Sequence, residues 1–270
     1  MIDSHFHCWR RADAKQAGIL AAPYLQRDVS FADLEEAAGG ELEAAVEIQV
    51  NDFCDGIIEA RYIEDEAAAH PRLGAHIAWA QLESPDLTRQ LNALQQIPTV
   101  RGIRRTCQIE HDPEFCARPD YIRGARELGK RGLLCEICVR LDQIAAVPRL
   151  AREAPETQIV LQHLGKPDVT HPPATQWLKA IEELGRLPNV TCKLSVIVHS
   201  DLDQPYRTER LAPFVTHAVE CFGSDRVMYG SNWPVSTAVV GYTAWVAMLG
   251  EMLGDNDVVF AENARRLYRL

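Results

Sequence analysis

The stretch MIDSHFH, residues 1–7, carries an acid and two histidines inside a short run of apolar residues. Successive side chains point to opposite faces of a β-strand, so Asp3, His5 and His7 are predicted to share one face. The pattern predicts a first strand with a histidine pair directed to one side. The runs that follow decide whether this strand belongs to a barrel, an open sheet or a loose terminus.

Further short runs rich in apolar and β-branched residues recur along the chain, at 43–50, 73–82, 99–107, 132–140, 158–164, 189–197 and 226–235. Stretches with helical periodicity separate most of them; residues 30–40, for example, begin at the N-cap residue Ser30 and end at Gly39 and Gly40. Eight strands alternating with helices predict an α/β protein, a single (β/α)8 TIM barrel over residues 1–270. The alternative, an open doubly wound sheet, usually has a glycine-rich turn after its first strand, which this sequence lacks.

Length, composition and charge agree with one large domain. The chain has 270 residues, 47% of them hydrophobic, and roughly 250 residues are typical of such a barrel. Its net charge of -10, without a basic cluster, argues against a nucleic-acid partner. The sequence shows no signal-peptide pattern and no apolar run near the roughly 18–20 residues of a membrane helix. We therefore expect a cytoplasmic protein without a membrane partner; its oligomeric state stays open, a homodimer included.

Polar residues interrupt the predicted strands near their carboxyl ends, where the active sites of such barrels lie. Leaving them buried and unsatisfied would cost on the order of 1–3 kcal/mol each, so they are predicted to face one cavity. The set consists of His5, His7, Arg104, Glu136, His163, Lys193 and Asn232. Trp9 and Trp233 are expected to form an apolar wall, and residues 8–28 a loop over the active site.

Histidines are the most informative members of this set. Two imidazoles that alternate on one strand are spaced to share a divalent metal or one anionic oxygen. His5, His7 and His163 are therefore candidate metal ligands, if a metal is bound, and candidate catalytic residues in either case. His76 is expected to be a hydrogen-bonded core residue instead.

The motifs DSHFH, QHLGKP, CKLS, MYGSNWP and ENARRLY, in that order, resemble the amidohydrolase superfamily. Within it they are similar to the sugar-lactonase-like group of the amidohydrolase-2 branch, which includes fuconolactonase-like and rhamnonolactonase-like enzymes. The resemblance covers nearly the whole chain and implies a (β/α)8 barrel. It implies that His5 and His7 are the strand-one pair, His163 the strand-six histidine, Arg104 a substrate-holding arginine and Lys193 the strand-seven lysine.

Position 232 departs from the family pattern, because GSNWP carries Asn where the family has the aspartate that accepts a proton from the attacking water. An amide has no useful basicity near pH 7 and is a poorer metal ligand than a carboxylate. The candidate bases are then His163, His7 and Glu136. Asn232 is expected to orient water or to bind a substrate oxygen.

We expect a hydrolase of carbohydrate catabolism that opens a small lactone, from a sugar acid or bearing a carboxylate, by attack of water on the ring carbonyl. His5, His7, His163 and Asn232 would be catalytic, with Arg104, Lys193, Glu136, Trp233 and Trp9 binding the substrate. The reaction is expected to need either no cofactor or one divalent cation such as zinc. The alternatives are a metal-dependent non-oxidative decarboxylase, a lactone isomerase, and a degenerate barrel that binds a sugar acid without turnover.

Overall fold

Eight parallel strands form one sheet in sequence order in the computed structural model, which describes residues 1–13, 22–50, 55–198, 207–254 and 256–270. The strands are β1 (Ile2–Phe6), β2 (Ala44–Ile48), β3 (Leu73–Ala78), β4 (Val100–Arg104), β5 (Leu134–Ile137), β6 (Ile159–Leu161), β7 (Val190–Ser195) and β8 (Val227–Gly230). Each lies within a run that the sequence predicts to be a strand.

The sheet closes on itself between its first and last strands. The backbone N–H of His7 donates to the carbonyl of Trp233 at 2.8 Å, and the N–H of Asn232 donates to the carbonyl of His5 at 2.7 Å. These bonds continue the ladder from β1 to the segment after β8. The predicted (β/α)8 barrel is therefore confirmed.

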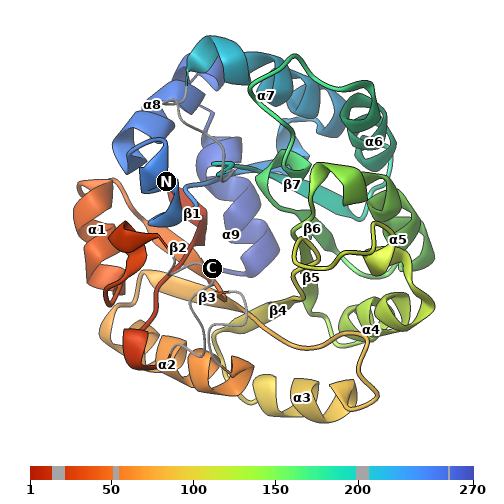
Figure 1. Ribbon diagram of the computed structural model, residues 1–270. Helices are drawn as coiled ribbons and strands as arrows, with labels where there is room; N and C mark the ends of the chain where they lie inside the picture. The colour runs from red at the N-terminus through yellow and green to blue at the C-terminus, as the bar shows by residue number, and fades with distance from the viewer. Residues whose placement is uncertain (14–21, 51–54, 199–206, 255) are drawn as a thin grey trace.

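Helices surround the strands in a ring, with α9 lying inside that ring in the view along the barrel (Figure 1). Within the described ranges they are α1 (Phe31–Ala38), α2 (Gly56–Ala69), α3 (Leu87–Leu94), α4 (Pro119–Lys130), α5 (Val147–Glu153), α6 (Thr175–Gly185), α7 (Thr208–Phe222), α8 (Tyr242–Leu253) and α9 (Asn263–Tyr268). Ser30 caps α1 as its sequence predicts, through a capping box with Asp33. A 3-10 turn, Leu141–Ala146, leads directly into α5.

Two apolar clusters fill the molecule. The larger one packs the outer faces of the strands against the helices. The smaller one fills the lower part of the barrel, where Ile2, Val46 and Ile77 meet Ala264 and Tyr268 of α9. Because α9 closes the end at which the strands begin, the polar side chains are left at the other end, where the strands finish.

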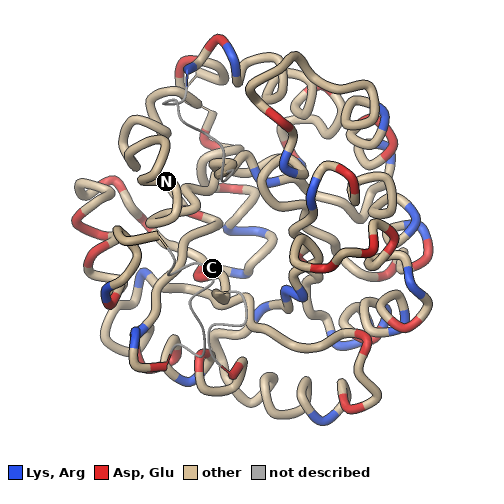
Figure 2. The backbone as a smooth tube through the Cα atoms, in the orientation of Figure 1, with Lys and Arg blue, Asp and Glu red and all other residues tan. Residues whose placement is uncertain are grey.

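Charged residues of both signs are interspersed around the outer ring of helices (Figure 2). Within the described ranges, none of the helices combines the length and the apolar composition needed to cross a bilayer.

Candidate active site

A cavity of about 70 Å³, the inner cavity, opens where the strands end. It is lined by His7, Val50, Arg104, Gln108, Cys138, His163, Lys166, Val198, Asn232 and Val235. Four polar residues that the sequence assigns to the mouth therefore meet there: His7, Arg104, His163 and Asn232. They come from the ends of β1, β4, β6 and β8 and are distant along the chain.

His5 lies directly behind this wall. Its ring centroid is 5.0 Å from that of His7 and 4.5 Å from that of His163. Neither ring nitrogen of His5 has a hydrogen-bond partner among the described residues, and the side chain is fully buried. Burial, reinforced by the nearby cationic groups, lowers the pKa of His5 well below its usual range. His5 is therefore neutral at pH 7.

His7 is held in one tautomer by its surroundings. Its Nδ1 lies 2.5 Å from the carbonyl oxygen of Ile48, which can only accept a hydrogen bond. Nδ1 therefore carries the proton, and Nε2 is left as an acceptor next to the side chain of Asn232, which hydrogen-bonds to the ring. Burial, with a smaller contribution from Arg104, lowers the pKa of His7 to about 3. This ring is a neutral proton acceptor across the physiological pH range.

His163 begins a turn in an unusual backbone conformation. His163, Leu164, Gly165 and Lys166 all have positive φ, between 50° and 71°. Left-handed conformations are unfavourable for residues other than glycine and are often retained where they position a functional group. The hydroxyl of Ser195 secures the first residue, since it accepts the backbone N–H of His163 at 3.1 Å and lies 2.9 Å from the ring Nδ1. The imidazole is thereby held through its Nδ1, and no hydrogen bond from a described residue engages its Nε2.

Arg104 supplies a buried positive charge. One guanidinium nitrogen donates to the Gln162 side-chain oxygen at 3.1 Å, and another donates to the backbone carbonyl of Gln49. Its Nε has no partner within the described ranges. Both acceptors are neutral, so the charge of Arg104 has no carboxylate in contact with it there.

Asn232 occupies a position that suits an amide. Its Nδ2 donates to the carbonyl of Val196 at 2.9 Å, and its backbone adopts the left-handed conformation at φ 57°. A carboxylate at this position would place an oxygen against the Val196 carbonyl oxygen. Asn is therefore part of the local hydrogen bonding, and its remaining amide groups face His7 and the inner cavity.

Lys193 and Glu136, which the sequence analysis assigns to the barrel mouth, are fully buried and do not line the inner cavity. The Lys193 Nζ is 2.6 Å from Glu136 Oε2 and 2.6 Å from the carbonyl oxygen of Ser4. Gln162 and the Tyr268 hydroxyl donate to the same carboxylate. The two residues thus complete a buried polar layer between the cavity and α9, where they contact each other in place of a substrate.

Asp3 also differs from the simple alternation of the first strand. The register between β1 and β2 shifts between Asp3 and Phe6, so the period of two is interrupted there. The Asp3 carboxylate accepts the backbone N–H groups of His5 and Ser231, at 3.0 and 2.9 Å. It braces the junction of β1 and β8 and does not line the cavity.

Trp9 and Trp233 are buried but are not among the residues that line the inner cavity. The indole N–H of Trp9 donates to the carbonyl of Arg27, which ties the two described ends of the segment 8–28 together. The hydroxyl of Tyr24 in this segment donates to the carbonyl of Val235, a residue of the cavity wall. Residues 14–21 of the expected loop lie outside the described residues.

A zinc site needs several donors directed at one point. Within the described ranges, no group of three histidine, cysteine, aspartate or glutamate side chains is arranged to hold a metal ion. The nitrogens of His5 and the Nε2 atoms of His7 and His163 are chemically suited to an ion, but position 232 offers an amide and the described side chains do not bring three donors to one point. The side chains as placed do not fit a three-ligand metal centre.

Lys166 and Gln108 line the cavity although sequence reasoning does not select them. Lys166 stands three residues after His163, within the QHLGKP motif, and the Gln108 side chain accepts a hydrogen bond from its Nζ. The QHLGKP motif could have identified Lys166 as a candidate site residue. The direction of the Lys166 side chain depends on the left-handed turn, which local propensity does not predict.

Comparison with known proteins agrees with this geometry. The chain matches the amidohydrolase family over residues 2–270. It is 29% identical to an L-fucono-1,5-lactonase of Burkholderia ambifaria over 287 residues, covering 100% of this chain and 95% of that protein. It is 28% identical to an L-fucono-1,5-lactonase of Burkholderia multivorans over 279 residues, covering 97% of this chain and 91% of that protein.

A crystal structure of an amidohydrolase from Burkholderia multivorans with bound zinc has the same fold, with a TM-score of 0.88 and 27% identity over 100% of this chain and 99% of that one. These similarities support a hydrolase. With a closed barrel, a cluster of imidazoles where its strands end and a family match over nearly every residue, the chain belongs to the amidohydrolase family.

Proposed function

We propose that this protein is a lactonase, which opens a small lactone by attack of water on the ring carbonyl. The observation that carries the proposal is His7, a neutral imidazole in the wall of a small polar cavity beside Arg104, His163 and Asn232, whose Nε2 is left as a proton acceptor. The names of the relatives at 28–29% identity support the same reaction class.

Each residue of the inner cavity has a role in this reaction. A water held by His7 Nε2 and the amide of Asn232 loses its proton to His7 as it attacks the carbonyl carbon. Arg104 stabilises the negative charge that develops on the carbonyl oxygen, and its buried position makes that interaction strong. His7, now protonated, returns this proton to the ring oxygen as the carbon–oxygen bond breaks, while the His163 imidazole hydrogen-bonds to the reacting groups.

A metal is not part of this scheme, because the side chains as placed do not form a ligand group. A bound zinc ion would supply Lewis-acid polarisation of the carbonyl. Because one structural relative contains zinc, the activity test below compares enzyme as purified with enzyme treated with a chelator.

The test is a panel of lactones followed with a pH indicator, using enzyme as purified and enzyme treated with a chelator. We expect acid release in both preparations, and a loss of about 100-fold or more in kcat for His7→Asn. His171→Asn, at an exposed position, is the matched control and should retain full activity. CO₂ release that requires metal would identify a decarboxylase, and interconversion of lactones without acid release an isomerase. Either result, or binding of a sugar acid without any turnover, would overturn the proposal.

A further inference from the structure

The inner cavity is too small for the substrate alone. Its volume of about 70 Å³ is comparable to two or three water molecules, at about 30 Å³ each in the liquid. A second cavity of about 630 Å³, the outer cavity, shares Gln108, Lys166 and Val198 with it. We call these three residues the throat. A lactone whose carbonyl enters the inner cavity must therefore extend through the throat into the outer one.

The walls of the inner cavity carry two cations and, within the described ranges, no acid. Arg104 contacts only neutral acceptors, and Lys166 donates only to the neutral side chain of Gln108. The neighbouring carboxylate of Glu136 is already paired with Lys193. Arg104 is buried without a carboxylate in contact, which is costly, and Lys166 is only partly exposed, so this wall is arranged for negative charge.

The charged groups of the outer cavity do not neutralise the positive charge of Lys166 at the throat. Arg140 pairs with Asp142 at 2.9 Å and donates to the backbone carbonyls of Gln108 and Glu110 at 2.6 and 2.8 Å. Asp168 is exposed and accepts hydrogen bonds from Thr170. Lys166 is therefore, among the described residues of the two cavities, the cation at the throat with no acidic partner.

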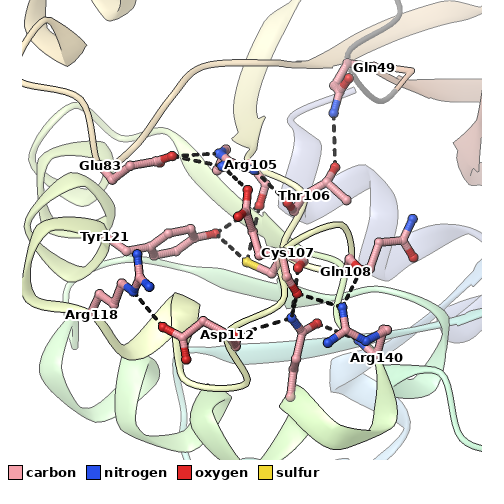
Figure 3. A network of polar contacts seen from close by, with 12 residues as sticks. Gln49, Glu83, Arg105, Thr106, Cys107, Gln108, Asp112, Arg118, Tyr121 and Arg140 are labelled. Atoms are coloured by element: carbon pink, nitrogen blue, oxygen red, sulfur yellow. Dashed lines mark hydrogen bonds and ion pairs between the residues drawn. The ribbon is translucent and has the colours of Figure 1, made fainter. Parts of the chain in front are cut away.

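The throat is held from both sides. On one side, the indole N–H of Trp177 donates to the carbonyl of Leu164 at 2.7 Å and anchors the left-handed turn that carries Lys166. On the other, the segment after β4 that carries Gln108 is fixed by a network of polar contacts that includes Arg140 and Tyr121 (Figure 3). Lys166 is thus positioned before a ligand arrives.

We propose that Lys166 is a specificity-determining residue, which selects lactones that bear a carboxylate and binds that carboxylate at the throat while the body of the ring occupies the outer cavity. This inference rests on the proposed lactonase function and names its substrate class. Arg104 faces the reacting carbonyl. The negative charge that develops on the carbonyl oxygen is the counter-charge for Arg104, which is one of the two cations. The second, Lys166, is left for an anionic substituent of the substrate.

The test uses two probes that differ in one charge, 5-oxotetrahydrofuran-2-carboxylate and its primary amide. A charge-assisted hydrogen bond contributes enough for a preference of about tenfold or more in kcat/KM for the carboxylate. Lys166→Met should remove that preference, mainly by raising KM for the carboxylate, and leave the amide nearly unchanged. Lys166→Arg should retain most of the preference. Lys130→Met, at the end of α4 and on the far side from the strand ends, is the control.

Equal use of both probes by the natural enzyme, or an equal loss for both in Lys166→Met, would overturn the inference without affecting the lactonase proposal. If neither probe is opened, calorimetry with the same two compounds still decides the matter. Binding of the carboxylate that exceeds binding of the amide and is lost in Lys166→Met supports a carboxylate site at the throat. Binding without preference refutes it.

Discussion

Lys193 Nζ lies 2.6 Å from Glu136 Oε2, and both side chains are fully buried inside the barrel. The pair stands one layer below the inner cavity, with the Tyr268 hydroxyl on the other carboxylate oxygen. Burial, opposed by Glu136, lowers the pKa of Lys193 to about 8. The pair is therefore a buried support for the floor of the site.

Lys193→Met should destabilise the protein by about 3–5 kcal/mol, because it leaves the Glu136 carboxylate buried without its cation. Adding Glu136→Gln should restore part of the loss. Denaturant unfolding of the two variants and the natural protein measures both effects. A variant with unchanged stability and a raised KM would instead show that Lys193 reaches the substrate.

Asn232→Asp should lower stability by about 1–3 kcal/mol, because the Val196 carbonyl loses its donor and faces a carboxylate. The same change adds a hard ligand beside the imidazoles, so zinc bound after dialysis should rise. Asn232→Ala separates the two effects, since it removes the donor without adding charge. Equal zinc contents in all three proteins would contradict this account of position 232.

The pH dependence of catalysis should lack a step near the usual pKa of histidine. Burial lowers the pKa of His7 to about 3, so the base stays in its proton-accepting form as the pH falls. We expect kcat/KM for a neutral lactone to remain level from pH 8 to pH 5. An acid limb centred near 6.5, in enzyme that remains folded at each pH, would exclude His7 as the base.

Glu59 should make stability decline with pH. Burial and the neighbouring Glu47 raise its pKa to about 8, while Val50 N–H donates to it at 2.8 Å. Between the unfolded pKa near 4.5 and about 8 the folded protein holds a proton that the unfolded chain has lost, so raising the pH favours unfolding by up to about 1.4 kcal/mol per pH unit.

Glu59→Gln keeps the hydrogen-bond acceptor for Val50 and removes the titrating proton. Unfolding free energies measured at pH 6 and pH 8 should therefore differ less for this variant than for the natural protein. The comparison isolates Glu59 from the other buried groups, because their contributions are common to both proteins. Parallel declines would show that Glu59 does not titrate in this window.

Local sequence patterns predicted the strands and most helices because those patterns are themselves local. Period-two runs give strands, three- and four-residue spacing gives helices, and Ser30 and Gly39 mark the ends of α1. The ends of parallel barrel strands meet at one rim, so His7, His163 and Arg104 could be predicted to converge from sequence alone.

Depth in the barrel and the choice of partner depended on tertiary structure. Lys193 and His7 both interrupt apolar strands, yet one is paired with Glu136 in the interior and the other lines the cavity. The register shift in β1 and the stagger between strands determine how deep each side chain lies in the barrel. Neither feature produces a periodic pattern that could be recognised in the sequence. Lys166 reaches the throat only because Trp177 and Ser195 hold four left-handed residues in place. The sequence by itself determined the barrel and the residues at its rim; tertiary hydrogen bonds and strand register decided which of them face a substrate.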